Sequence, residues 1–355
     1  MDNGGDLLMK FPEMVARLPQ YIAFRRGYGA PLPANMTFSV IDRCNMACRT
    51  CGIWKNRDTD ELTPEEYRKI VEPLDLYWVT ITGGEAFMRD DIVEVVETIV
   101  NGTDAQYVTI ATNGMLREKT VASMEELLEK TSAEYVLNFS VDGTSETHEH
   151  IRRIKDAFEK LSSTIEAVRA LDPERINIGV NTVVSRFNED EIPETYREVR
   201  EKLEPDSFIA EVAEQRDKLY NEDMEFAPED PDAALDFLIE SLEEEKRRGT
   251  PRRVKMMRKG FYRFLKHDRE MKNYTGFISA QLNPDGELWP NASTKRVMGD
   301  LTGDYDFEKV WRGRKAEKVR EQIREENPQD MLANSFYNNA ICQPLKFLEL
   351  TRTGR

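Results

Sequence analysis

The sequence predicts an α/β fold in which a mostly parallel sheet is closed wholly or partly into a barrel. Short segments rich in β-branched and aromatic residues alternate with helical patterns over the first two thirds of the chain. These segments are nearly continuous apolar runs, as in parallel strands covered by helices. The pattern changes near Ala227, where "APEDPDAAL" is proline-rich and acidic. A smaller second module is therefore expected beyond this point.

Six segments are predicted to be strands because β-branched and aromatic residues dominate them. They are Met36–Ile41, Tyr77–Thr82, Gln106–Thr112, Glu134–Val141, Ile176–Val184 and Ser207–Val212. Helices between parallel strands imply right-handed crossovers, so the carboxyl ends of all six strands should meet at one edge. Functional sites in such sheets lie at this edge, in the loops that follow the strands.

Two helix boundaries follow from local chemistry. In "LTPEEY", Thr63 and Glu66 have the spacing of a capping box, and Pro64 suits the first helical turn. Asp90 to Val100 carries an apolar stripe with helical period, and Asn101 and Gly102 are expected to end that helix. The βα alternation is thus supported by capping as well as by periodicity.

The second module has different components. An acidic helix is predicted over Ala233–Arg248, and Arg252–Lys272 is basic, with nine Lys or Arg against two acids. A hairpin is expected in "ISAQLNPDGELWP", followed by one amphipathic helix over Asp306–Glu326. We therefore expect an N-terminal helical segment (1–35), a barrel-like domain (36–226) and a smaller α+β extension (227–355).

Composition limits the functional classes. No stretch approaches the roughly 18 consecutive apolar residues of a membrane span, and no apolar leader with a cleavage site opens the chain. A cytoplasmic location is expected, where thiols stay reduced. The formal net charge of −16 argues against general affinity for nucleic acid, which is bound through an excess of Lys and Arg.

Three of the four cysteines are clustered in "DRCNMACRTCGIW", directly after the first predicted strand. Cys44, Cys48 and Cys51 should lie on the loop at the carboxyl end of that strand. A structural zinc site usually has four protein ligands, and no fourth ligand is near in sequence. Three thiolates can instead hold three irons of a 4Fe-4S cluster and leave the fourth iron open. Both readings remain at this point: a cluster with an open iron, or a non-catalytic zinc or iron-sulfur protein.

The motifs around these cysteines resemble those of radical S-adenosylmethionine (SAM) enzymes. CNMACRTC has the CxxxCxxC spacing of that family, "TGGEAF" follows the second strand, "ATNG" ends the third, and "FSVDG" ends the fourth. The resemblance covers roughly Met36 to Val212 and implies a partial (β/α)6 TIM-like barrel.

The resemblance implies that Cys44, Cys48 and Cys51 ligate one 4Fe-4S cluster, whose open iron is chelated by SAM. It implies an enzyme in which an external electron donor of flavodoxin or ferredoxin type reduces the cluster. SAM is then cleaved reductively to a 5'-deoxyadenosyl radical, which abstracts a hydrogen atom from the substrate. The cofactors would carry this chemistry, and the protein would orient them and exclude water.

The resemblance also implies SAM-binding residues at the ends of the second, fourth and fifth strands: Gly83, Gly84, Glu85, Ser140, Asp142, Arg152 and Asn181. A carboxylate at Glu85 suits the SAM amino group, and the guanidinium of Arg152 suits its carboxylate. His148 and His150 are expected at the surface. Where many family members carry an aromatic residue before the third cysteine, this chain has Thr50, so packing around SAM is expected to depend on Trp54 or another side chain.

The C-terminal segment resembles the SPASM and twitch extensions of the same superfamily, on "NPDGELWPN" and the following "MGDLTGDYDFEKVW". That pattern places a cysteine five residues after the hairpin glycine, where this chain has Asn291. We therefore expect a SPASM-like module without an auxiliary cluster. Cys342 is either a buried small side chain or a thiol that returns a hydrogen atom to a substrate radical.

The substrate class stays open. The SPASM resemblance favours a peptide or protein, whereas cationic segments at Phe11–Arg26 and Arg252–Lys272 favour a lipid, a peripheral membrane contact or another anionic metabolite. Alternatively, the basic helix pairs with the acidic helix before it and serves only as a solvated face.

Overall fold

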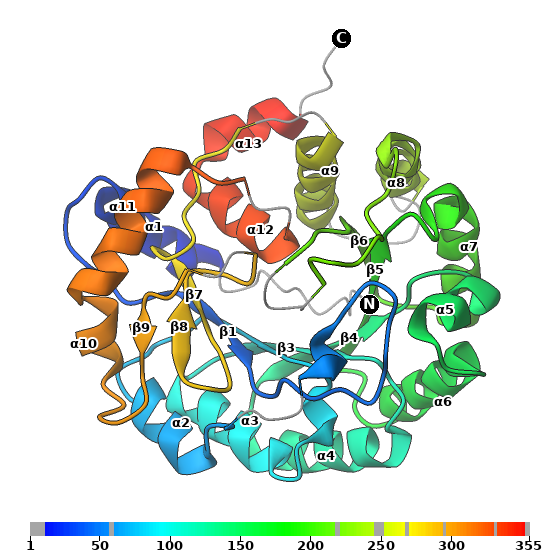
Figure 1. Ribbon diagram of the computed structural model, residues 1–355, viewed down its shortest axis with the longest axis horizontal. Helices are drawn as coiled ribbons and strands as arrows, with labels where there is room; N and C mark the ends of the chain where they lie inside the picture. Colours follow the sequence, from blue (N-terminus) through cyan, green and yellow to red (C-terminus); the bar gives the residue numbers. More distant parts are fainter. Residues whose placement is uncertain are drawn as a thin grey trace.

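The computed structural model describes residues 11–56, 60–216, 221–244, 252–266, 270–293, 296–329 and 332–351 (Figure 1). Its centre is an open, curved sheet with the strand order β6-β5-β4-β3-β2-β1-β7-β8-β9. The first six strands are parallel, as the sequence predicts. They are β1 (Asn35–Ser39), β2 (Trp78–Thr82), β3 (Tyr107–Thr112), β4 (Glu134–Ser140), β5 (Ile176–Val184) and β6 (Ser207–Val212). The predicted α/β class and partial, unclosed barrel are confirmed.

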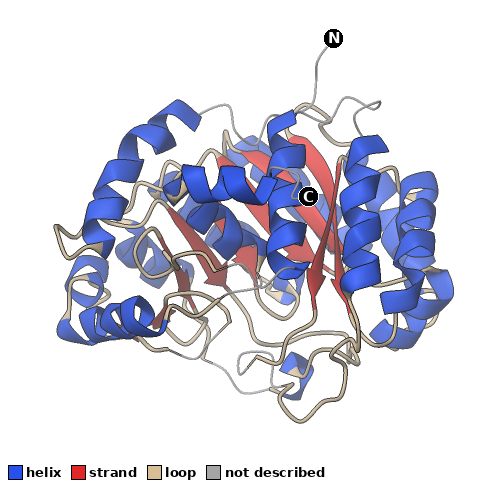
Figure 2. Cartoon of the chain, turned by 90° about the horizontal axis from the view of Figure 1, so that it is seen from above, coloured by secondary structure: helices blue, strands red, loops and turns tan. Residues whose placement is uncertain are grey.

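Helices follow the first five of these strands and cover the convex side of the sheet (Figures 1 and 2). They are α2 (Pro64–Val71), α3 (Ile92–Gly102), α4 (Arg117–Lys130), α5 (Ser145–Arg152), α6 (Ala157–Arg169) and α7 (Ile192–Lys202). The capping box at Thr63 and Glu66 is present, with both reciprocal hydrogen bonds. The apolar stripe of α3 is buried, but the helix includes Asn101 and Gly102 and has Thr103 as its C-cap, so it ends two residues later than expected.

The predicted hairpin forms and joins the same sheet. Its first strand, β7 (Ser279–Leu282), pairs in parallel with β1, while β8 (Glu287–Trp289) and β9 (Gly299–Asp300) continue antiparallel. Gly286 has a φ of +84° in the turn, which a glycine adopts without strain. The sheet is therefore continuous across the two modules expected from the sequence, a pairing that local patterns could not reveal.

The remaining helices lie around the other side and the open edge of the sheet (Figure 1). They are α1 (Phe11–Arg25), α8 (Asp232–Glu244), α9 (Arg252–Lys266), α10 (Phe307–Trp311), α11 (Arg314–Glu326), α12 (Ala333–Cys342) and α13 (Pro344–Thr351). Three short 3-10 turns complete the described elements: η1 (Ile53–Lys55), η2 (Ala86–Met88) and η3 (Glu189–Glu191). Among the helices that the structure describes, none combines the length and apolar character needed to cross a bilayer.

The prediction of one continuous helix near the end of the chain is wrong. The segment Asp306–Glu326 forms two helices, because Gly313 is extended between them. Asp306 caps α10 by accepting the Lys309 backbone N–H at 2.9 Å. The acidic helix α8 and the basic helix α9 pack against each other, with an ion pair between Lys266 and Asp236. The predicted end of the acidic helix, Arg248, lies outside the described residues, whereas Lys272, the last residue of the basic segment, is described and is not helical.

The strands are not uniformly apolar, which corrects the expectation from their sequences. Residues such as Ile81 of β2 and Leu137 of β4 point to the helices and belong to the main core. The alternate residues on the opposite, inner face include Thr80 and Asn138, which are only partly buried. Side chains alternate between the two faces of each strand, so the sheet has an apolar outer face under the helices and a more polar inner face.

Candidate functional site

The cysteine loop connects β1 to α2 and begins at the carboxyl edge of the sheet, as predicted. Cys48 is buried, and Cys44 and Cys51 are half-buried. The pKa of Cys44 is raised to about 11 and that of Cys51 to about 12, mainly by burial and to a lesser extent by the neighbouring thiols. The three sulfur atoms thus influence one another electrostatically and would stay protonated until a metal displaced their protons.

The thiols do not converge on one point. No three His, Cys, Asp or Glu side chains among the described residues are arranged as ligands of a metal ion would be. In a 4Fe-4S cluster, by contrast, each thiolate binds its own iron, so the three sulfur atoms stand around the cluster rather than around one ion.

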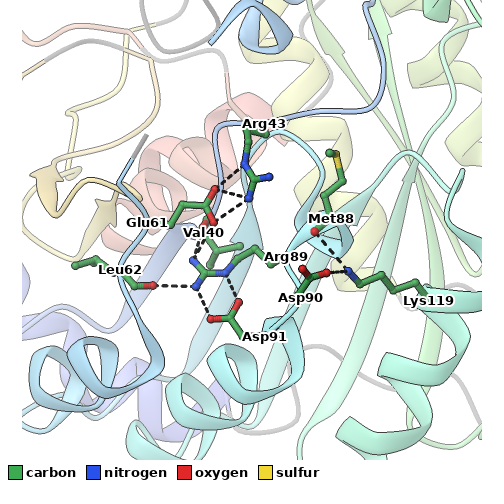
Figure 3. A network of polar contacts seen from close by, with 9 residues as sticks. All are labelled: Val40, Arg43, Glu61, Leu62, Met88, Arg89, Asp90, Asp91 and Lys119. Atoms are coloured by element: carbon green, nitrogen blue, oxygen red, sulfur yellow. Dashed lines mark hydrogen bonds and ion pairs between the residues drawn. The ribbon is translucent and has the colours of Figure 1, made fainter. Parts of the chain in front are cut away.

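Arg89 ties the two ends of the cysteine loop together (Figure 3). Its buried guanidinium donates to the carbonyl oxygen of Val40 at 2.8 Å and to that of Leu62 at 2.9 Å. The same group forms two 2.8 Å hydrogen bonds with the carboxylate of Asp91. Glu61 accepts from Arg43 at 3.0 Å beside this contact. One planar, fork-shaped cation therefore closes a loop whose middle carries the three thiols.

Gly83 and Gly84 dock on the chain just before the first cysteine. The N–H of Gly84 donates to the carbonyl oxygen of Ile41 at 2.7 Å, and the N–H of Glu85 donates to that of Arg43 at 3.0 Å. A Cβ at Gly83 would overlap the Ile41 oxygen, and one at Gly84 would overlap the Arg43 oxygen. The glycines are thus required for a close approach between two protein segments, in addition to any approach to a ligand.

Glu85 is buried and is hydrogen-bonded within the protein. Its carboxylate accepts from the Asn113 N–H at 2.7 Å, from the Thr112 hydroxyl at 2.9 Å and from the Phe87 N–H at 3.3 Å. Burial raises the pKa of Glu85 to about 7. The carboxylate therefore joins the loop after β2 to the end of β3, a role that sequence reasoning did not assign.

Asn113 is a site residue that sequence reasoning missed. Its Nδ2 donates to Asn45 Oδ1 at 2.7 Å and lies 3.9 Å from Cys44 Sγ. The only signal was its place in "ATNG" at the end of β3. Since Glu85 fixes the Asn113 backbone, the two motifs act together on the side of the loop that carries Cys44.

Arg152 and Asp142 lie on the side of the loop that carries Cys48. Arg152 Nη2 is 2.8 Å from Asp142 Oδ2, and Nη1 is 3.7 Å from Cys48 Sγ. The other carboxylate oxygen of Asp142 accepts the Val183 N–H at 3.0 Å. Both oxygens of Asp142 are thus engaged by the protein, and the acid orients the arginine toward the thiol.

The surface position expected for His148 is wrong. The ring is 1 % exposed, packs edge-on against Phe158, and its Nδ1 accepts the Asp142 N–H at 3.1 Å. Burial, assisted by the positive charge of Arg152, lowers the pKa of His148 to about 3, so the ring is neutral. The helical pattern of α5 does not distinguish this face, because the covering helix α6 comes later in the chain. His150, by contrast, is exposed as expected.

Ser140 and Asn181 are neighbours across the β4–β5 pairing and are both half-buried. The side-chain amide of Asn181 donates to Glu211 at 3.5 Å. Its Oδ1 is buried and has no hydrogen-bond partner within the described part of the chain, and the same is true of Arg152 Nε. Two polar atoms in the predicted SAM-binding set are therefore available to a ligand.

A pocket of about 440 Å³ opens over the cysteine loop. Trp54 lines it and donates from Nε1 to the Cys51 carbonyl oxygen at 3.0 Å. The pocket is lined by Arg43, Cys44, Asn45, Met46, Ala47, Trp54, Asn56 and Met88.

Cys342 and Asn291 lie apart from these residues. Cys342 is buried in a small apolar cluster with Tyr21 and Ile278, where burial raises its pKa to about 12. Such surroundings suit a small apolar side chain. Asn291 accepts the Ser293 N–H at 3.1 Å and donates to Thr275 at 3.3 Å, so it organises its own loop.

Comparison with known proteins agrees with this geometry. Residues 38–199 match the model of the radical SAM superfamily. GTP 3',8-cyclase of Alkaliphilus metalliredigens is 31 % identical over 166 residues, which cover 44 % of this chain and 49 % of that protein. AdoMet-dependent heme synthase of Methanosarcina barkeri is 30 % identical over 178 residues, 48 % of each chain. The matched segment thus spans about half the length of these relatives.

Solved structures share the fold over most of the chain. The structure described as native anSMEcpe with bound AdoMet has a TM-score of 0.60 at 14 % identity, covering 90 % of this chain and 99 % of that one. Streptococcus suis SuiB bound to the precursor peptide SuiA has a TM-score of 0.60 at 12 % identity, covering 85 % of this chain and 70 % of that one. At these identities the likeness concerns the fold alone.

Proposed function

Because residues 38–199 match the model of the radical SAM superfamily, we propose that this chain is an enzyme that cleaves S-adenosylmethionine reductively at one 4Fe-4S cluster. Cys44, Cys48 and Cys51 would ligate that cluster. The observation that supports the proposal most strongly is the placement of three neighbouring thiols on one loop at the carboxyl edge of the sheet. The competing reading is a non-catalytic zinc or iron-sulfur protein that uses the same thiols.

The residues around the loop suit the proposed cofactors. Burial raises the pKa of the Cys48 thiol, and the cation of Arg152 beside it acts in the opposite direction, so it favours the thiolate that a cluster binds. The unpartnered Arg152 Nε and Asn181 Oδ1 offer a donor and an acceptor to SAM. A bound 4Fe-4S cluster and SAM would together supply the one-electron reduction and the hydrogen abstraction from the substrate.

The chain's own residues would position these groups. Arg89 and the glycines of the 83–85 motif hold the loop, and Glu85 holds Asn113 beside Cys44. Gly83, Gly84 and Glu85 remain proposed neighbours of the SAM amino group, although their hydrogen bonds within the protein show a supporting function. Ser140 and Asp142 remain proposed at the ribose or carboxylate, with Asp142 acting through Arg152.

The substrate is a separate proposal. The GTP 3',8-cyclase relatives support a nucleotide, and the likeness in fold to SuiB with its precursor peptide supports a peptide. The packing of α9 on α8 supports the structural account of the basic segment over lipid binding. The reduced thiols and the cluster would need a reducing compartment, such as the cytoplasm, and an external electron donor of flavodoxin or ferredoxin type.

Metal analysis and SAM cleavage test the proposal. Anaerobically reconstituted protein should contain about four irons in a site-differentiated cluster. With dithionite and SAM it should release 5'-deoxyadenosine. Alanine at any one of Cys44, Cys48 or Cys51 should abolish both, whereas Cys342→Ala, which removes a buried thiol elsewhere, should keep both. Zinc in place of iron, with no SAM cleavage, would establish the competing reading.

A further inference from the structure

We propose that Gln281 and Asn283 on the inner face of β7 form a recognition site for an amide N–H and an amide C=O that the substrate presents side by side. The site rests on the proposed function, since it lies at the strand edge from which the cysteine loop begins. It names the substrate chemistry that the cysteine motifs leave open.

Sheet register places the two side chains on the inner face. Ala280 and Leu282 belong to the main apolar core, so Gln281 and Asn283 point to the opposite side. Gln281 is level with Thr37 of β1, and Asn283 follows at the level of Ser39, five residues before Cys44. The next residue, Pro284, accepts the Leu62 N–H at 2.9 Å and so fixes this turn to the end of the cysteine loop.

Each of these two side-chain amides uses only one of its two polar groups in a hydrogen bond. Gln281 Nε2 donates to Asn283 Oδ1 at 2.8 Å. Gln281 is 2 % exposed and Asn283 is fully buried, yet Gln281 Oε1 and Asn283 Nδ2 have no hydrogen-bond partner within the described residues. Turning both amides over exchanges their roles but still leaves one acceptor and one donor. Two adjacent unpartnered groups of opposite kind in one buried place indicate a missing partner.

The neighbouring strand shows what a structural amide pair looks like. Asn35 and Asn338 bond to each other in both directions, at 2.8 and 3.4 Å, and join β1 to α12. Gln281 and Asn283 also form a hydrogen bond with each other, but one polar group of each side chain remains without a partner among the described residues. The residues level with them on β1 and β2 are the hydroxyls of Thr37, Thr80, Ser39 and Thr82.

A substrate meets this requirement when an amide N–H donates to Gln281 and an amide C=O beside it accepts from Asn283. The lactam edge of a guanine base presents these two functions side by side, and a residue in an extended peptide presents its own N–H and C=O on one side of the chain. The side chains offered are neutral, so the site recognises hydrogen-bonding pattern and not charge. Its selectivity should therefore be against analogues that lack the N–H.

Binding to the reconstituted full-length protein in the presence of SAM tests the site. The probes are N-acetylalanine N-methylamide for a peptide source and GTP for a lactam source, with N,N-dimethylacetamide as the analogue without N–H. We expect one of the first two to bind and the third not to bind. Gln281→Met with Asn283→Leu should weaken that probe roughly tenfold, since it removes two neutral hydrogen bonds. Asn177→Ala, on the same inner face at β5, should not weaken it.

Melting temperatures test the site without any probe. Because the two amides are incompletely bonded without ligand, the apolar double variant should melt at or above the temperature of the wild type. Asn35→Leu, which breaks the satisfied pair, should melt lower. A double variant that melts well below the wild type, or wild-type protein that binds neither probe, would overturn the proposal. Iron content and SAM cleavage are measured on the same samples, so a failure of the proposed function is seen separately.

Discussion

Asp142 and Arg152 form a buried ion pair in which Nη2 lies 2.8 Å from Oδ2, and the same guanidinium reaches Cys48 Sγ at 3.7 Å. One carboxylate thus sets the direction of a cation at the proposed cluster. Since the side chain of Asp142 is 2 % exposed and that of Arg152 only 12 % exposed, removing either charge leaves the other poorly compensated. The pair links the end of β4 to the cysteine loop through α5.

Asp142→Asn should destabilise the protein by about 3 kcal/mol, because it leaves the Arg152 charge buried without its partner. Chemical denaturation measures this change, and equilibrium binding of SAM should weaken in parallel. Glu225→Gln is the matched control, since Glu225 pairs with Arg186 at the surface and the expected loss is below about 1 kcal/mol. Equal losses in the two variants would contradict the importance of burial.

Arg89→Lys should open the cysteine loop. A lysine ammonium cannot reproduce the fork that serves Val40, Leu62 and Asp91 at once, so we expect a loss of about 3 kcal/mol and a lower iron content after reconstitution. Arg68→Lys controls for the exchange itself, because Arg68 is exposed and pairs with Glu65 one turn away. Full iron content in the Arg89 variant would show that the loop holds without this clamp.

Gly84→Ala should displace the cysteine loop, because the new Cβ would overlap the Arg43 carbonyl oxygen and approach the Cβ of Cys44. The backbone cannot move aside as a flexible side chain can. We therefore expect the free energy of unfolding to fall by at least about 2 kcal/mol, as at other overpacked sites. Gly303→Ala is the comparison: Gly303 has a φ of +99° but no atom within 4 Å of such a Cβ. Its expected cost is about 1 to 2 kcal/mol from backbone conformation alone. Melting temperatures of the two variants measure the difference.

His148 should make stability depend on acid. Its pKa is lowered to about 3 in the folded protein, so below the unfolded value of about 6.5 the unfolded chain binds the additional proton. Stability from this group is therefore fully present above about pH 6.5 and falls as the pH drops toward 3. The expected loss is about 2 kcal/mol between pH 7 and pH 5.

His148→Gln keeps an acceptor for the Asp142 N–H but does not titrate. The free energies of unfolding of the two proteins, measured by denaturation at several pH values, should converge as the pH falls. The free energy of the variant should depend less steeply on pH. Parallel slopes would mean that His148 is protonated in the folded state.

Much of this site was predictable because its signals are local. The strand segments, the capping box of Thr63 and the spacing of the three cysteines depend on neighbours within a few residues, where periodicity and capping chemistry operate. The family motifs then placed Glu85, Asp142 and Arg152 near the loop. Gly313 shows the limit of periodicity, since an apolar stripe continued through a residue at which the helix stops.

The sequence by itself determined which residues form strands and helices and which thiols gather on one loop. Only the tertiary structure decided that His148 is buried, that Arg89 holds both ends of that loop, and that β7 lies beside β1 with Gln281 and Asn283 facing inward. The physical reason is distance along the chain: the bond between Asn35 and Asn338 joins residues 303 positions apart. Burial and hydrogen-bond partners depend on such contacts, and no local pattern records them.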